Sequence, residues 1–523
     1  MRRTSKAPTA NRGSILLAVL VLVAVMTVGG LSYFNWTNTE RRASAAFTRQ
    51  AQTLAAAESG AEFLRVYLSE EPSLLEQDGG LYDNPGRFQG VIVDDSAADS
   101  LRTRFSMLAP NLDVMGVYDG YRFGLENESA RINLNTVLLA DDYVEDGARQ
   151  MLTSLPGVTD SIADAILDWI DEDDEPRAYG AELSYYSTLV PSYAPANRPL
   201  QSLDELLLVR DIGEALLYGL DRDRNFVIDS DEALLALDDG VENLDGSANR
   251  GLAAYLTLSS AERNVDINGD PRIDLNQDDL ELLHGEVEQA LGLAAANFIV
   301  AYRQGGAEQD SNGGSATSAE QVQIDFEVPG SETISSVLSL VGVRTSTTPL
   351  GDDRKVTVET PFPNDPSQML SYLPDLLDYV TVTSDATIPG RVNVNQAPRA
   401  VLQGLPGMPP EVVDLIVSAR TFDPASIDPT RRHAAWMLAE GLIELEAMQE
   451  LEPFVTGTGD VYRTQITGYF DAGGMASRLE VVVDATEQPP VLRRRRDLTP
   501  LGSRLSSAEL SGIAGSAVEG GPL

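Results

Sequence analysis

Oxygen-bearing residues follow a regular spacing near the middle of the chain. Positions 1, 3, 5, 7, 9 and 12 of an EF-hand-type loop would be Asp221, Asp223, Asn225, Val227, Asp229 and Glu232. Oxygens at this spacing wrap a cation of the size of Ca²⁺, with a main-chain carbonyl at Val227 and a carboxylate at Glu232. Phe226 stands where Gly normally makes the sharp turn, so the loop geometry can differ. We predict Ca²⁺ binding; a solvated acidic loop is the alternative.

Two further sets of acids have ligand-like spacing. The first set is Asp266, Asn268, Asp270 and Asp274, with the Arg272 carbonyl between the last two. It has Pro271 at the Gly position and Gln277 at position 12, so a turn leading into a repeated phrase is the alternative. The second set is Asp171, Asp173 and Glu175, for which a charged loop end is the alternative. Both are weaker calcium hypotheses than the 221–232 loop.

The composition restricts the chemistry of the 523 residues. There are 80 Asp+Glu against 38 Lys+Arg, a net charge of -42, no Cys, and two His, His284 and His433. Thiolate and multi-His centres are therefore excluded, and an enzyme would need carboxylates alone. Asp173 with Asp174, or Glu182, would be the candidates for an anchored hydrolase. Their dense acidic setting is better explained by cations or solvent, so we predict no enzymatic activity.

Two Pro-Gly turns lie between amphipathic runs, at Pro156-Gly157 and Pro406-Gly407. Such a turn joins two short helices, because Gly supplies a positive φ and the flanking apolar residues pack together. The pattern looks like a helix-hairpin-helix (SAM-like) unit. Many such units bind DNA, but the first is followed by acids at 160, 164, 168 and 171–175. These acids would repel phosphates. The hairpin at Pro406-Gly407 has the basic residues Arg399 and Arg420, but Glu411 and Asp414 lie close to them in the sequence, so it is no better suited to bind DNA. We therefore predict packing against protein.

A repeated phrase precedes each helical stretch. It occurs as Arg-Ile-Asn-Leu-Asn at 131–135, Arg-Ile-Asp-Leu-Asn at 272–276 and Arg-Val-Asn-Val-Asn at 391–395. The middle copy ends in residues 283–302 and lacks Pro-Gly, and residues 201–213 resemble a fourth, partial hairpin. Coincidence is a poor explanation of three such phrases.

The N-terminal residues predict a membrane helix. Four basic residues are followed by residues 14–31, which carry no charge. At 1.5 Å per residue this run spans about 27 Å, close to the hydrocarbon thickness. Trp36, Glu40 and Arg41 follow in place of a secretory cleavage site, and the basic flank keeps the N-terminus cytoplasmic. The helix is expected to continue over 39–70, with an apolar face of Phe47, Leu54, Ala57, Ala61, Leu64 and Leu68.

The junction Arg12-Gly13-Ser14 resembles the class III leader of pilins and pseudopilins, which a prepilin peptidase cuts after Gly. Cleavage would then fall between Gly13 and Ser14. An uncleaved signal anchor is the alternative.

A longer signature identifies one family. Its parts are Asp168-Trp169-Ile170-Asp171, Asp173-Asp174, Pro176-Arg177, Gly180-Ala181-Glu182, Tyr185-Tyr186, Leu203-Asp204-Glu205-Leu206 and Leu217-Tyr218-Gly219. Together with the leader they resemble the minor pseudopilin K (GspK) family of type II secretion systems, over residues 12 to about 500.

The resemblance implies an α+β fold in which a pilin-like N-terminal helix packs on an antiparallel sheet and a large all-α domain of SAM-like units is inserted. The expected domains are a leader (1–13), a transmembrane part (14–31), a periplasmic helix (32–72), a first head part (73–125), the insertion (126–321), the remaining head with a further hairpin (322–500) and a disordered tail (501–523). Strands are expected at 88–93, 121–125, 322–328, 337–344, 355–358, 463–469 and 478–483 from their alternation. The basic run 493–496 is expected in a solvated tail, or against an acidic face.

The resemblance also implies a function. The chain would be a single-pass inner-membrane protein with its bulk in the periplasm, priming and capping a pseudopilus that exports folded proteins. Its partners would be minor pseudopilins of the I and J types, the inner-membrane platform and the prepilin peptidase. From the residues themselves, the ligand spacing adds structural Ca²⁺ and the acidity excludes nucleic acid as a partner. Ala18 stands at the fifth mature position, where most pilin-like subunits carry Glu; a tip subunit has no neighbour above it to pair with. A DNA-uptake pseudopilus component is the alternative.

Overall fold

The computed structural model describes residues 12–96, 98, 100–238, 249–308, 316–351, 354–420, 429–502 and 505–512. The leader residues 1–11 and the end of the expected tail, 513–523, lie outside these ranges. Gly13 and Ser14 belong to the first turn of the N-terminal helix.

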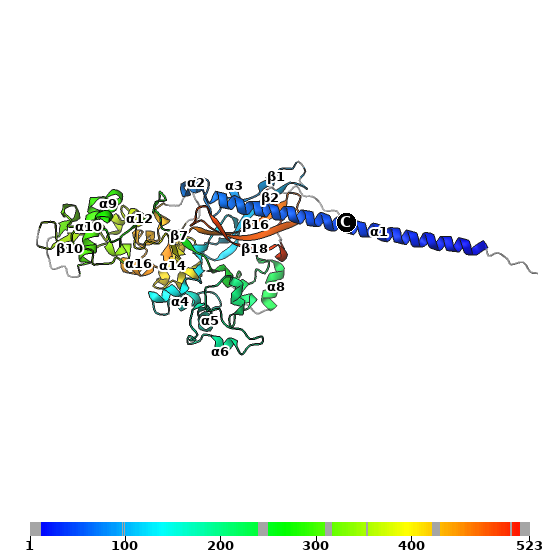
Figure 1. Cartoon of the computed structure of the whole chain (residues 1–523), viewed down its shortest axis with the longest axis horizontal. Helices are drawn as coiled ribbons and strands as arrows, with labels where there is room; N and C mark the ends of the chain where they lie inside the picture. Colours follow the sequence, from blue (N-terminus) through cyan, green and yellow to red (C-terminus); the bar gives the residue numbers. More distant parts are fainter. Residues whose placement is uncertain are drawn as a thin grey trace, which may run out of the picture.

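The N-terminal helix α1 (Arg12–Tyr67) has an exposed half and a packed half. Its apolar first half is long enough to cross a membrane and touches no other part of the fold, as Figure 1 shows. From Thr53 onward one face is buried, including Ala57, Ala61 and Leu64, as the spacing predicted. Phe47 is an exception at 71% exposed, because the sheet does not reach that far along the helix.

A seven-stranded antiparallel sheet lies under the packed half of α1 (Figure 1). Its order is β1-β2-β16-β17-β18, with β3 beside β2 and β4 beside β16. The strands are β1 (Val91–Asp94), β2 (Thr103–Leu112), β3 (Tyr118–Phe123), β4 (Glu126–Asn127), β16 (Val461–Phe470), β17 (Ala476–Asp484) and β18 (Val491–Asp497). The helix lies directly on β16, since a Cβ at Gly468 would stand 2.1 Å from the Thr53 carbonyl oxygen. Short helices α2 (Pro72–Gln77) and α3 (Pro85–Phe88) lead from α1 into the sheet.

The insertion is larger than the sequence predicted. The chain leaves the sheet after β4 and returns at β16, so residues 128–460 lie outside it, whereas the insertion was expected to end at 321. Its α-helices are α4 (Gly147–Thr153), α5 (Asp160–Ile170), α6 (Leu183–Tyr186), α7 (Glu214–Tyr218), α8 (Ser230–Asp238), α9 (Leu280–Leu291), α10 (Leu293–Gly305), α11 (Pro366–Met369), α12 (Leu373–Tyr379), α13 (Arg399–Gly404), α14 (Pro410–Ala419), α15 (Trp436–Ala439) and α16 (Leu445–Leu451). Short strands accompany them, so the insertion is not all-α.

Three of the expected strands are wrong as parts of the head sheet. Residues 322–325 are irregular and lead into a turn at 326–327, and η6 (Val337–Leu340) is a 3-10 helix. The segment at 355–358 becomes β11 (Val356–Glu359), which pairs with β10 (Arg344–Thr347) and β9 (Thr317–Ser318) inside the insertion. Alternation marks an extended chain with one covered face, but it does not say which sheet the chain joins.

The three repeated phrases form one recurring structure. Each places a two-residue strand parallel to a later segment: β5 (Ile132–Asn133) with β6 (Leu256–Thr257), β8 (Ile273–Asp274) with β12 (Val380–Thr381), and β14 (Val392–Asn393) with β15 (Val455–Thr456). The last Asn of each phrase donates to two carbonyls from separate segments. These are Leu200 and Leu258 for Asn135, Ile334 and Val382 for Asn276, and Arg431 and Gly457 for Asn395. The Asn side chain therefore holds three segments together in each copy.

Both Pro-Gly turns join helix pairs. Gly157 lies between α4 and α5, Gly407 between α13 and α14, and both have φ of +77°. The two pairs pack together, because a Cβ at Gly404 would meet the Ser154 hydroxyl at 2.2 Å. In the middle copy α9 and α10 are joined at Gly292, with φ of +90°. The partial hairpin at 201–213 is η3 (Leu203–Leu208) followed by α7.

The described C-terminal residues, up to residue 512, differ from the expected solvated and disordered tail. The basic run belongs to β18, which pairs with β17, and its Arg495 forms an ion pair with Glu58 on α1. Residues 505–512 are not disordered, since α17 (Ser507–Ser511) follows the sheet and buries Leu510 against Phe226 and Tyr469. Hydrogen bonds also hold this segment, because Ser106 Oγ donates to the Leu510 carbonyl at 2.8 Å and Gln89 Nε2 donates to the Glu509 carbonyl at 3.1 Å.

Candidate metal sites

The loop 221–232, named the 221 loop below, brings three carboxylates together. Asp221, Asp223 and Glu232 can each place a ligand oxygen within 4.8 Å of the others, and these are the only three residues in the described ranges that form such a group. Asp221 is 2% and Glu232 5% exposed. Buried carboxylates at this separation repel one another unless a proton or cation joins them.

The main chain of the 221 loop folds around these carboxylates. Asp221 accepts hydrogen bonds from the main-chain N–H groups of Asn225 and Phe226, both at 2.9 Å. Glu232 closes the loop by accepting from Arg222 at 2.9 Å and Asp223 at 3.2 Å. The sequence therefore identified a real turn, with its position-12 carboxylate opposite its position-1 carboxylate.

Phe226 takes the conformation expected of Gly at this position. Its φ is +72°, in the left-handed region that a side chain disfavours. Its ring packs with Leu108, Tyr469 and Leu510, so burial of the ring offsets the strain. The 221 loop is thereby attached to the sheet and to α17.

The buried position of Asp221 changes the pKa of its carboxyl group. Burial raises the pKa of Asp221 to about 6, although the N–H groups of Phe226 and Asn225 and the charge of Arg250 oppose this. A cation bound by the 221 loop would favour the ionised carboxylate.

The second acidic region follows α5, and part of it is neutralised by arginine. Asp164 accepts hydrogen bonds from Nε and Nη2 of Arg149 at 2.6 and 2.7 Å. The fully buried Asp168 accepts one from Nη1 of Arg177 at 3.2 Å. Gly180 packs on Asp168 so closely that a Cβ would stand 1.8 Å from its Oδ2. Two of the acids expected to repel DNA are therefore structural ion-pair partners.

Glu182 is the carboxylate in this region that most needs a partner. It is 2% exposed and neither of its oxygens accepts a hydrogen bond. Burial, together with Asp168 and Asp171, raises the pKa of Glu182 to about 7. Asp171 Oδ1 and Asn197 Oδ1 are also buried without a hydrogen bond, while the Asn197 amide donates to the Asp173 carbonyl at 2.8 Å. These buried oxygens have no hydrogen-bond donor, although Asp171, Asp173 and Glu182 do not come within 4.8 Å of one another as the carboxylates of the 221 loop do.

We name Asp171, Asp173, Glu182 and Asn197 the 171 cluster. Spacing suggested Glu175 as the third ligand, but Glu175 is exposed and only its main-chain N–H meets Asp173. The spacing did not place Glu182 and Asn197 beside Asp171, because they lie 11 and 26 residues after it. The sequence signal was the Gly180-Ala181-Glu182 motif, in which Glu182 was considered as a catalytic carboxylate but not as part of a cation site.

The 266–274 set forms a tight turn. Asp266 Oδ1 accepts from the N–H groups of Asn268 at 2.8 Å and Asp270 at 2.9 Å, and Val265 bridges to Pro271. Asp274 belongs to the second repeated phrase, where its Oδ1 accepts a hydrogen bond from the main-chain N–H of Asn276 at 2.9 Å. These contacts agree with the alternative expectation, a turn that leads into the second repeated phrase.

Comparisons with known proteins show what the first part of the insertion is similar to. Residues 130–222 match the family described as type II secretion system (T2SS), protein K. The type II secretion system protein K of Aeromonas hydrophila is 29% identical over 215 residues, which are 40% of this chain and 60% of that protein. A putative protein K of Escherichia coli (strain K12) is 43% identical over 64 residues, 12% of this chain and 20% of that protein.

A solved GspK-GspI-GspJ complex from the type 2 secretion system of enterotoxigenic Escherichia coli contains a chain that aligns at a TM-score of 0.37 and 11% identity, covering 88% of this chain and 99% of that one. The chain spans about three fifths of the Aeromonas protein and a smaller share of the Escherichia coli K12 protein. The resemblance to protein K that the sequence predicted is confirmed.

Proposed function

Because the chain resembles protein K and carries that family's first domain at residues 130–222, we propose that it is a minor pseudopilin of a type II secretion system. It primes and caps the tip of the periplasmic pseudopilus that exports folded proteins. The observation that carries the proposal is this domain match, in an insertion within a head whose sheet lies under a long apolar helix.

The anchor supports a place in the inner membrane. The prepilin peptidase cuts between Gly13 and Ser14, the residues before the cut stay cytoplasmic, and the head lies in the periplasm. With Ala18 at the fifth mature position, the helix lacks the Glu that would pair with the N-terminus of a neighbour in lipid, where an unpaired charge is costly.

The insertion supports a place at the tip. It projects below the sheet and beyond the end of α1 opposite the exposed apolar half, as Figure 1 shows. In a filament shaft such a mass would collide with the neighbours stacked around the helices. At the tip it has free space, and the other faces of the head are left for I-type and J-type minor pseudopilins and the inner-membrane platform.

The helix pairs act in protein packing as SAM-like helix-hairpin-helix units. The two Pro-Gly pairs contact each other through Gly404 and Ser154, so a face of each is already covered. Arg149 and Arg177 are engaged with Asp164 and Asp168, which leaves them unavailable to phosphates. The proposal therefore includes no nucleic acid and no catalysis.

Calcium is the structural cofactor of this proposal. Asp221, Asp223, Asn225, Asp229 and Glu232, with the Val227 carbonyl, would hold one ion in the 221 loop. Asp171, Asp173, Glu182 and Asn197 would hold a second, which would give the unpartnered oxygens of Glu182 a cation. In a chain without Cys, such ions would link segments as disulfides do elsewhere.

The partner proposal is tested by reconstitution. The full chain is co-expressed in membranes with I-type and J-type minor pseudopilins of the same organism, extracted in detergent and measured by native mass spectrometry. We expect a complex with one copy of each subunit. Recovery of an I–J pair without this chain would contradict the proposal.

A further inference from the structure

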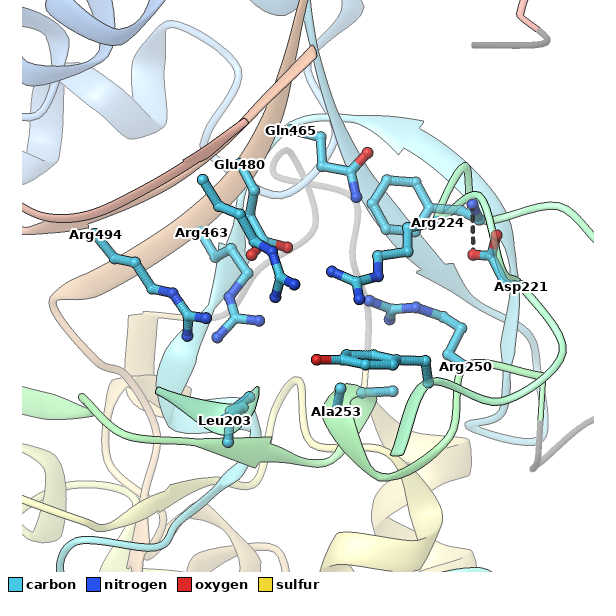
Figure 2. A pocket seen from close by; sticks show the side chains of 13 residues that line it. Leu203, Asp221, Arg224, Arg250, Ala253, Arg463, Gln465, Glu480 and Arg494 are labelled. Carbon is cyan, nitrogen blue, oxygen red and sulfur yellow. Dashed lines mark hydrogen bonds between the residues drawn. The ribbon is translucent and has the colours of Figure 1, made fainter. Parts of the chain in front are cut away.

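A cavity of about 50 Å³ lies where the insertion meets the sheet. The sheet contributes Arg463, Gln465, Glu480, Arg494 and Arg496, and the insertion contributes side chains that include Arg224 and Arg250. Figure 2 shows arginine side chains from both sides pointing into the same space. Arginine side chains of the sheet and of the insertion therefore face one another across this cavity.

The cavity wall carries an excess of positive charge. Five guanidinium groups line it, against the carboxylates of Glu480 and Asp221. Arg463 is paired with Glu128 and Arg496 lies 3.1 Å from Asp204, whereas the ion pair of Arg250 with Glu126 is long and Glu126 is already paired with Arg131. In the described part of the chain, Arg250, Arg224 and Arg494 are therefore the three guanidinium groups of the wall without a close carboxylate partner.

These three are weakly satisfied. Arg250 Nη1 is buried without a hydrogen bond and lies 3.8 Å from the Glu126 carboxylate. Arg224 Nε is also buried without a hydrogen bond, and the guanidinium lies over the Tyr218 ring at 3.8 Å. Arg494 reaches Ser202 Oγ at 3.4 Å, a long contact. Buried N–H donors of charged groups are costly to leave without an acceptor.

Glu480 does not neutralise the group. Burial opposes its ionisation, but Arg463 and Arg494 outweigh burial and hold the pKa of Glu480 below its ordinary value. Its single negative charge is shared among several arginines, so the wall keeps a net positive charge.

We propose that this cavity binds a small tetrahedral oxyanion of the phosphate or sulfate class. Guanidinium groups match the oxygens of such anions in paired hydrogen bonds. The cavity is far smaller than the roughly 300 Å³ or more of a pocket for a drug-sized ligand, so a nucleotide is not the ligand. The inference does not depend on the proposed function.

The anion would join the two parts of the protein. Arg494 comes from β18 of the sheet, whereas Arg250 precedes η4 (Leu252–Ala254) and Arg224 belongs to the 221 loop. A dianion between them would replace mutual repulsion of the three guanidinium groups by attraction to one shared centre. The bound anion fixes the insertion on the head.

The test is isothermal titration calorimetry of the full chain in detergent with inorganic phosphate. A chelator is present to keep calcium away from phosphate, and chloride at equal ionic strength is the reference. Sulfate is titrated in a second series with 1 mM calcium chloride. We expect saturable binding with one site per chain in both series.

Two single variants and one control locate the site. Arg494→Gln and Arg250→Gln remove a cavity charge, and each is expected to weaken phosphate binding at least about tenfold. Arg495→Gln is the matched control, because Arg495 belongs to the same strand but pairs with Glu58 outside the cavity. It should bind as the unchanged chain does.

Circular dichroism checks that each variant is folded, and if one is not, the other carries the test. The inference is overturned if the unchanged chain gives no saturable heat in either series. It is also overturned if Arg495→Gln loses as much affinity as Arg494→Gln, since binding would then follow the surface charge.

Discussion

Arg478, on β17, donates a hydrogen bond from Nη1 to the main-chain carbonyl oxygen of Asp223 at 2.9 Å. The same side chain donates to the carbonyl oxygens of Arg224 at 2.5 Å and Gly502 at 2.6 Å, and Arg478 is 3% exposed. A single guanidinium in the sheet therefore holds the 221 loop and the segment after β18. The 221 loop is both a candidate metal site and a contact between insertion and head.

Arg478→Met should loosen this contact. Three carbonyls lose a charged donor, two of them in the 221 loop, and we expect the free energy of unfolding to fall by about 3 kcal/mol. Urea denaturation of the full chain, followed by tryptophan fluorescence, measures the change. Arg495→Met is the control, because it removes an exposed arginine from the neighbouring strand. Equal stability of the two variants would show that the Arg478 contacts do not hold the loop.

Glu232→Gln should weaken calcium binding at least about tenfold, because it removes a charge from the position-12 ligand while keeping its shape. Calorimetric titration of the full chain with Ca²⁺ measures the affinity. Asp231→Asn is the matched control, since Asp231 is an exposed acid beside Glu232 that is not at a ligand position. If calcium gives neither heat nor thermal stabilisation of the unchanged chain, the 221 loop is only an acidic turn.

The stability of the calcium-free protein should fall as pH rises through the titration of Glu182. Its folded-state pKa of about 7 lies above the ordinary value of 4.5 for a glutamate, so the folded state binds the proton more tightly. Its contribution is complete below pH 4.5 and is lost between pH 4.5 and about 7.

Glu182→Gln removes this dependence. With a chelator present, the free energy of unfolding of the variant should exceed that of the unchanged chain by about 1 kcal/mol at pH 8. At pH 4.5 the two values should be nearly equal. Thermal unfolding at the two pH values measures the difference. With calcium present the order at pH 8 should reverse, because the ionised carboxylate then has a cation; an unchanged order would remove Glu182 from the 171 cluster.

Gly180→Ala should destabilise the region after α5 by at least about 2 kcal/mol. The new Cβ would meet Asp168 Oδ2 at 1.8 Å and displace a buried carboxylate from Arg177. Gly213→Ala is the control, since no atom lies within 4 Å of its added Cβ. Trp169, buried on α5, reports the change by fluorescence. Equal effects of the two substitutions would show that the packing of Gly180 on Asp168 is not tight.

Local chemistry in the sequence predicted local structure well. Pro156-Gly157 and Pro406-Gly407 do form turns with a positive φ at Gly. The apolar spacing Ala57, Ala61 and Leu64 did give the buried face of α1. In these cases the residues that decide the structure are neighbours in sequence.

Features that depend on distant segments were missed. Strand β2 is buried along nearly its whole length, and it was not among the strands expected from alternation of polar and apolar residues. Strand β18 consists mostly of arginines, whose partners Asp484, Glu58 and Asp204 come from three other segments. The end of the insertion was misplaced for the same reason: the strand that resumes the sheet, β16, pairs with residues about 360 positions earlier.

The most direct test of the account measures export through the type II channel in the organism that encodes this chain, after deletion of its gene. We predict that secreted substrates accumulate in the periplasm and that pseudopili are lost or altered in number. Export should return with the unchanged gene but not with a Gly13 substitution that blocks leader cleavage. Normal secretion and normal pseudopili in the deletion strain would contradict the assignment as a minor pseudopilin.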